Sequence, residues 1–218
     1  MNQPSSATKL KLFCQVLAWF ITTGAVALAI TAWGSDHSYH FSQLNAYQVF
    51  PVLGLIAYST MWSHYVASVI RRLLGLDFHT LKRYFAVTRF IVLACICLHP
   101  GILIYRLFRD GQGLPPSSYE HYVAPGLAWV TLLGSVSLLV FLTYELRPWF
   151  SKRSWWRYVT YAGDAAMVAI FYHGLRLGSQ LQHGWFMKVW WFYGLTLIAS
   201  LAFNYYQRFL RQTKSPTV

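Results

Sequence analysis

Residues 84–108 read YFAVTRFIVLACICLHPGILIYRLF, an apolar run in which the charged residues are Arg89 and Arg106. An α-helix rises 1.5 Å per residue, so about twenty residues cross a hydrocarbon core of about 30 Å. The run is long enough to do so. It predicts a transmembrane helix.

Five further apolar runs have similar length and lie at 12–33, 47–70, 123–146, 157–178 and 186–208. Hydrophobic residues make up 56% of the 218 residues and charged residues 11%, whereas a soluble domain carries roughly 25% charged residues. The connections are short, and no GxGxxG or phosphate-binding loop occurs. We predict an all-α, integral membrane six-helix bundle that forms a single transmembrane domain over residues 1–218. The first run is of full spanning length without a clear cleavage site, so we expect no cleavable signal peptide.

Eighteen Lys and Arg residues against six Asp and Glu give a net charge of +12. The basic residues gather in alternate connections and at both ends of the chain. By the positive-inside rule these segments are cytoplasmic, which places the N and C termini there in a multi-pass protein of the bacterial inner membrane. Clusters of this kind meet anionic lipid, so the expected partner is membrane lipid and not nucleic acid. They comprise Lys9, Lys11, Arg71, Arg72, Lys82, Arg83, Arg147, Lys152, Arg153, Arg157, Arg208, Arg211 and Lys214.

Several tryptophans lie near the ends of the predicted spans, where aromatic side chains form interfacial belts. We assign Trp155, Trp156, Trp185, Trp190 and Trp191 to such belts. Cys95 and Cys97 should point to different faces of one helix and act as small apolar residues.

His99 and His173 each lie fifteen residues beyond the cytoplasmic edge of their runs, about 22 Å along a helix. Two histidines at equal depth on parallel helices match the requirement for bis-histidine ligation of one haem b. Arg106 and Arg176 lie farther outward on the same helices and could pair with the haem propionates. Alternatively, the histidines are interhelical hydrogen-bonding residues and the arginines extend to the outer interface.

The stretches RYFAVTRFIVLACICLHPGILIYR (83–106) and WWRYVTYAGDAAMVAIFYHGLRL (155–177) resemble the third and fifth helices of the ferric reductase-like transmembrane family. RRLLGL (71–76), six helices and short loops make the chain most similar to the haem-binding membrane subunits of periplasmic methionine sulfoxide reductase systems. Larger members carry two histidines on each helix for inner and outer haems. The resemblance implies that His99 and His173 hold the outer haem iron, while the inner positions fall at Phe85 and Thr160, which cannot ligate it.

Three ionisable residues occupy the inner half instead, at about 8–9 Å from the inner edge. They are His64, Arg89 and Asp164. One hypothesis is a quinone or FMN headgroup site in which His64 or Asp164 moves protons. An alternative is an Arg89–Asp164 ion pair with His64 as hydrogen-bond partner, and a third is an inner haem held by His64 and His79.

Four other histidines fall in the predicted outer loops: His37, His40, His121 and His183. Imidazoles there could capture a metal ion, or they could simply be solvated.

These features favour a b-type haem membrane protein, the electron-transfer subunit of an oxidoreductase. It would take electrons from a cytoplasmic flavoprotein, flavin or quinol and deliver them to a periplasmic reductase or a ferric chelate. Redox partner proteins are expected because the chain has no nicotinamide domain, and no residue is assigned a catalytic role. The alternative is a non-redox membrane protein, either a small transporter or an anchoring or assembly subunit.

Overall fold

The computed structural model describes residues 6–36, 39 and 44–214, and over these residues the chain is helical with no strand. Two short helices, α4 (Tyr119–Tyr122) and α6 (Arg147–Phe150), and two 3-10 segments, η2 (Phe78–Leu81) and η3 (Ser179–Leu181), separate the long helices. The long helices fall on the six predicted runs, which confirms the all-α prediction. They are α1 (Ser6–Asp36), α2 (Ala46–Leu73), α3 (Lys82–Arg109), α5 (Ala128–Tyr144), α7 (Trp156–Leu177) and α8 (Trp185–Lys214).

Local sequence explains several helix boundaries. Asn45 begins α2 with a capping box, in which its side chain accepts from the Gln48 backbone N–H and the Gln48 side chain accepts from the Asn45 backbone. The fourth predicted run begins at residue 123, but α5 starts five residues later. The reason is a turn at Pro125–Gly126, where Gly126 has φ +81° and the Leu127 N–H donates to the Ala124 carbonyl at 3.0 Å.

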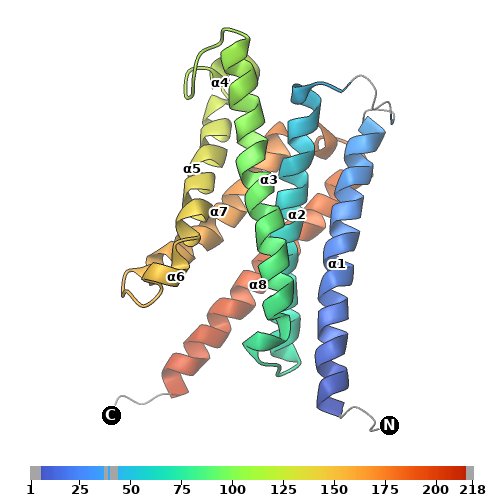
Figure 1. Ribbon diagram of the computed structural model, residues 1–218, viewed down its shortest axis with the longest axis vertical. Helices are drawn as coiled ribbons and strands as arrows, with labels where there is room; N and C mark the ends of the chain where they lie inside the picture. Colours follow the sequence, from blue (N-terminus) through green and yellow to red (C-terminus); the bar gives the residue numbers. More distant parts are fainter. Residues whose placement is uncertain (1–5, 37–38, 40–43, 215–218) are drawn as a thin grey trace.

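Some of the long helices lie side by side, and two others cross behind them. Figure 1 shows α1, α2 and α3 side by side, with α5 on the other side and α7 and α8 crossing behind. Within this arrangement α2 packs against α1, α3 and α8, and α5 packs against α7. The first residues of α1 and the last residues of α8 lie at the same end of the structure.

A cluster of three buried hydroxyl groups joins α1, α2 and α3. The Thr22 Oγ1, Ser63 Oγ and Tyr84 OH atoms lie 2.7–2.8 Å from one another. The Thr22 and Ser63 hydroxyls also lie 2.9 Å and 2.7 Å from carbonyls of their own helices, which are alternative acceptors for the same protons. The cluster satisfies buried polar groups that would otherwise be costly in an apolar surrounding.

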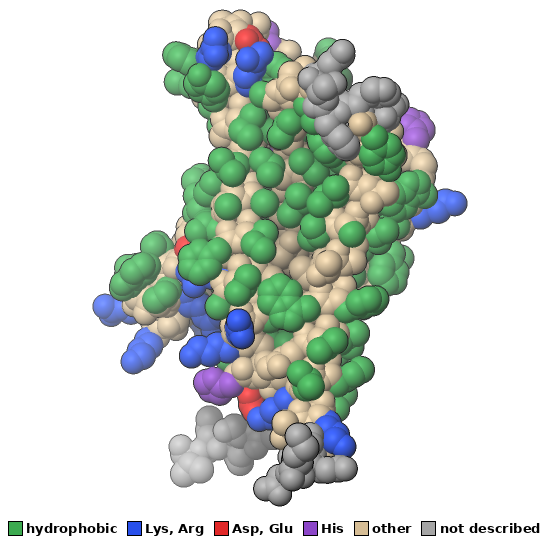
Figure 2. Space-filling view, turned by 45° about the vertical axis from the view of Figure 1, so that its right-hand side comes forward, with side chains coloured by type: hydrophobic (Ala, Val, Ile, Leu, Met, Phe, Trp, Pro, Cys, Tyr) green, Lys and Arg blue, Asp and Glu red, His purple; other side chains and the backbone are tan. Residues whose placement is uncertain are grey.

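The outer surface of the helices is apolar. Figure 2 shows hydrophobic side chains over the middle of one face and most of the Lys and Arg side chains near its lower end. Among the described residues, three helical segments are long and apolar enough to cross a membrane: Ser6–Asp36, Phe78–Arg109 and Trp185–Leu210. The helix Ala128–Tyr144 is apolar but shorter. These helices indicate a membrane protein.

Two predictions about individual side chains have different outcomes. Cys95 is buried and Cys97 is exposed, so they do point to different faces of α3. The assignment of Trp190 to an interfacial belt is wrong, because it is 1% exposed and packs on Tyr58, with ring centroids 4.3 Å apart. Trp156 is also buried, whereas Trp155, Trp185 and Trp191 are exposed.

Candidate functional site: two cavities along the bundle

His99 of α3 and His173 of α7 line one cavity of about 560 Å³, here called the histidine cavity. Most of the lining residues come from α2, α3, α5 and α7, and most of the side chains are apolar. Cavities of this volume hold ligands of cofactor size. The two histidines predicted to lie at equal depth are thus brought to the same space, although their helices are distant in sequence.

Each imidazole is fixed in the same way. The Nδ1 atom of His99 lies 2.8 Å from the Phe50 carbonyl oxygen, and that of His173 lies 2.8 Å from the Val130 carbonyl oxygen. Because a carbonyl only accepts, Nδ1 carries the proton in both rings, and in the neutral form of each ring Nε2 is unprotonated. The Nε2 atoms have no hydrogen-bond partner in the described part of the chain. A neutral imidazole with a free Nε2 is the form that ligates a metal.

The two arginines expected near the propionates lie differently. Arg176 lines the histidine cavity. Arg106 does not, because its guanidinium lies 3.7 Å from Asp110 and 5.5 Å from the centre of the Tyr47 ring. The physical reason is axial distance: Arg106 lies seven residues, about 10 Å, beyond its histidine, whereas Arg176 lies three residues, about 4.5 Å, beyond His173.

A second cavity, of about 930 Å³, contains all three ionisable residues of the inner half, His64, Arg89 and Asp164. We call it the basic cavity. Its remaining charged lining residues are Arg72, Lys82, Arg147, Arg208 and Glu145. Arg72 and Lys82 come from the first predicted cytoplasmic connection, Arg147 from the second and Arg208 from the C-terminal helix, so the structure brings these basic clusters together at one end.

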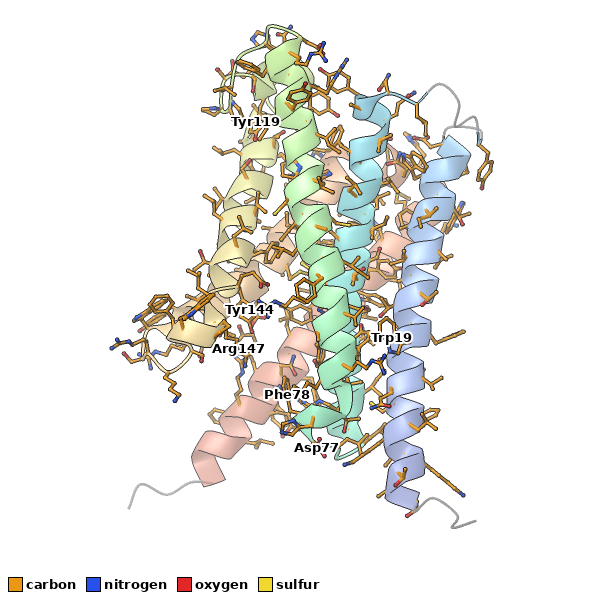
Figure 3. All side chains as sticks on the ribbon, in the orientation of Figure 1. Trp19, Asp77, Phe78, Tyr119, Tyr144 and Arg147 are labelled. Carbon is orange, nitrogen blue, oxygen red and sulfur yellow. The ribbon has the colours of Figure 1, made fainter. Side chains whose placement is uncertain are left out.

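The labelled side chains of Figure 3 mark the two ends. Tyr119, which lines the histidine cavity, lies at one end of the structure, while Tyr144, Arg147 and Phe78, which line the basic cavity, lie toward the other. Met61, Ile96 and Phe141 line both cavities. These three apolar side chains therefore form part of the wall between the two cavities.

The predicted Arg89–Asp164 ion pair is wrong. Arg89 instead pairs with Glu145, with its Nε 2.6 Å from Oε2. Asp164 accepts hydrogen bonds from the hydroxyls of Tyr65 at 2.9 Å and Tyr205 at 2.8 Å. Arg89 and Asp164 lie at similar depth and line the same cavity. However, the guanidinium of Arg89 on α3 pairs with Glu145 at the end of α5.

His64 and His79 are not brought together as the ligands of an inner haem would be. The Nε2 atom of His64 lies 2.7 Å from the Thr88 hydroxyl, and His79 does not line the basic cavity. Phe85 and Thr160 both line the basic cavity. The two positions that the sequence resemblance matched to inner haem ligands therefore lie in this cavity, but neither side chain can ligate iron.

Some site residues could not be recognised from the sequence pattern. Tyr65 and Tyr205 contact Asp164 from other helices. The only sequence signal for them was that each places a hydroxyl group within an apolar run. Gly54 and Gly134 contact the two imidazoles, and an isolated glycine within a helical pattern is the signal that could have identified them.

The outer-loop histidines give no metal centre in the described residues, where no three His, Cys, Asp or Glu side chains gather. His121 and His183 are exposed. His37 and His40 lie outside the described residues.

The chain was also compared with known proteins. No protein-family model, no curated protein and no solved structure matches it.

Proposed function

We propose that this chain is a six-span membrane protein, with both ends cytoplasmic, that binds haem b between His99 and His173 and carries electrons outward across a bacterial inner membrane. Its donor would be a flavin, flavoprotein or quinol at the basic cavity. The observation that carries the proposal is the shared cavity, in which two imidazoles are each held by Nδ1 and free at Nε2.

The membrane topology is supported by the placement of the polar side chains. The helices α2 and α7 have 28 and 22 residues, enough to span, although neither is among the three segments identified above as long and apolar enough to cross a membrane. Their polar residues His64, Asp164 and His173 line cavities inside the bundle. Ionisable groups within a membrane typically face a bundle interior or a water-filled cavity in this way.

The residues of the histidine cavity fit a haem. His99 and His173 would hold the iron through their ring nitrogens, and Arg176 would pair with a propionate. The apolar walls would limit the access of water to a bound haem, which favours electron transfer over ligand exchange. The haem would supply one-electron redox chemistry, while the protein orients it and tunes its potential.

The basic cavity fits an anionic or proton-coupled donor. Its five cations, Arg72, Lys82, Arg89, Arg147 and Arg208, suit the phosphate of FMN, and Asp164 or His64 could accept a proton when a quinol is oxidised. The wall of Met61, Ile96 and Phe141 keeps the two cavities close while separating their contents. Electrons would leave toward a periplasmic reductase partner or a ferric chelate.

The test is the absorption spectrum and the haem-to-protein ratio of the purified protein. Wild type should bind one haem per chain and show sharp α and β bands on reduction. His99→Ala and His173→Ala should each abolish these bands, whereas the exposed control variants His121→Ala and His183→Ala should retain them. Colourless wild-type protein expressed with adequate haem would refute the redox function and leave the small transporter or assembly subunit as the function to test.

A further inference from the structure

A glycine lies against each of the two cavity histidines. A Cβ atom added to Gly54 of α2 would lie 2.8 Å from Cε1 and 3.0 Å from Nδ1 of His99. A Cβ atom added to Gly134 of α5 would lie 2.7 Å from Cε1 and 2.9 Å from Nδ1 of His173. Real Cβ contacts are not this short, so each imidazole occupies the space of a missing side chain.

The carbonyl that accepts from each ring lies four residues before that glycine. Phe50 precedes Gly54 and Val130 precedes Gly134 by this spacing, so each carbonyl also accepts the glycine N–H within its own helix. One helical turn thus provides a carbonyl that accepts from the ring and, at the glycine, the space that the ring occupies. The same arrangement occurs twice, in helix pairs α2–α3 and α5–α7, which are unrelated in local sequence.

Backbone conformation does not require either glycine. Neither has a positive φ, and both are in the interior of a helix, where alanine is more favourable than glycine by about 1 kcal/mol. The effect of an alanine at either position would therefore be to prevent the close approach of the imidazole ring.

We propose that Gly54 and Gly134 are positioning residues that fix both imidazoles in the Nδ1–H tautomer and direct Nε2 into the cavity. The proposal rests on the haem-binding function above. The hydrogen bond from Nδ1 makes Nε2 a stronger donor to a metal, and contact with the helix backbone fixes the plane of the ring. Each glycine would then set the strength and the orientation of one axial ligand.

The first experiment needs no haem. In ¹⁵N-histidine-labelled, haem-free wild-type protein, NMR should show Nδ1 protonated and Nε2 unprotonated for both His99 and His173, with the signals assigned by single His→Gln variants. An Nε2–H tautomer at both residues would overturn the proposal.

The second experiment compares haem-loaded glycine variants. Gly54→Ala and Gly134→Ala should each shift the largest g value of the low-spin ferric EPR signal and raise the midpoint potential, because a weakened Nδ1 hydrogen bond stabilises ferric iron less. The matched controls Gly101→Ala and Gly163→Ala lie on the histidine-bearing helices with no atom within 4 Å of the added Cβ, and they should leave both unchanged.

The outcomes separate the two proposals. Wild-type protein that binds haem, with glycine variants identical to the controls in g value and potential, would overturn the positioning role and leave the haem function standing. A wild-type protein that takes up no haem would overturn the proposed function. If Gly54→Ala or Gly134→Ala does not fold, the tautomers of the wild-type protein still decide the positioning role.

Discussion

Removing one hydroxyl group from the Thr22–Ser63–Tyr84 cluster should measurably loosen the packing of α1, α2 and α3. Tyr84→Phe deletes the oxygen that contacts both Thr22 and Ser63 but keeps the ring, which packs edge-on against Trp19, with centroids 5.2 Å apart. The residue is 2% exposed, so water cannot replace the lost partner. The variant isolates two interhelical hydrogen bonds.

The magnitude follows from those two bonds. Interhelical hydrogen bonds in membrane proteins contribute about 0.6 kcal/mol on average and at most about 1.7 kcal/mol. Thr22 and Ser63 remain bonded to each other at 2.8 Å, so no hydroxyl is left without a partner. We therefore expect Tyr84→Phe to lower the free energy of unfolding by about 1–2 kcal/mol, which is roughly a 5- to 30-fold change in the folded-to-unfolded ratio.

Reversible unfolding in bicelles, followed by tryptophan fluorescence, measures this difference. Tyr105→Phe is the matched control, since Tyr105 is on the same helix, is exposed and makes no described hydrogen bond. A double-mutant cycle with Ser63→Ala should give a coupling energy of about 0.5–1 kcal/mol. Equal stabilities of Tyr84→Phe and Tyr105→Phe would show that the cluster does not hold the helices together.

Two predictions concern electron transfer. Arg176→Gln should lower the haem midpoint potential, by on the order of 1 kcal/mol in the free energy of reduction, because a nearby cation favours the added electron. The control Arg106→Gln changes an arginine outside the cavity and should leave the potential at the wild-type value. Identical redox titrations of the two variants would contradict this prediction. Asp164→Asn should slow stopped-flow reduction by quinol or reduced flavin by about tenfold or more, while dithionite reduction stays at the wild-type rate. Equal slowing with both reductants would indicate a structural role for the contacts of Asp164 with Tyr65 and Tyr205.

Depth along the helices was predictable from the sequence, because each residue advances a helix by a constant rise. The constant rise predicted that His99 and His173 lie at one depth and that His64, Arg89 and Asp164 lie at another. In the structure the first two line one cavity and the other three line a second. The constant rise could not identify partners, which depend on how neighbouring helices are rotated and tilted. For this reason Arg89 pairs with Glu145 rather than with Asp164.

Burial of individual aromatic residues was also beyond the sequence pattern. Trp190 lies near the end of an apolar run, as an interfacial residue would. However, α8 crosses behind α2 and also packs against α7, so Trp190 is buried against Tyr58 and Gly174. The glycines at 54 and 134 could be located as unusual positions in helices, yet their role depends on rings contributed by other helices.

The most direct test of the central claim is an experimental density map of the purified protein in nanodiscs. If haem binds between the two histidines, the map should show a planar macrocycle in the histidine cavity, with density continuous from its metal to Nε2 of both His99 and His173. Imidazoles turned away from each other, or a cavity filled by lipid or side chains with no macrocycle, would contradict it.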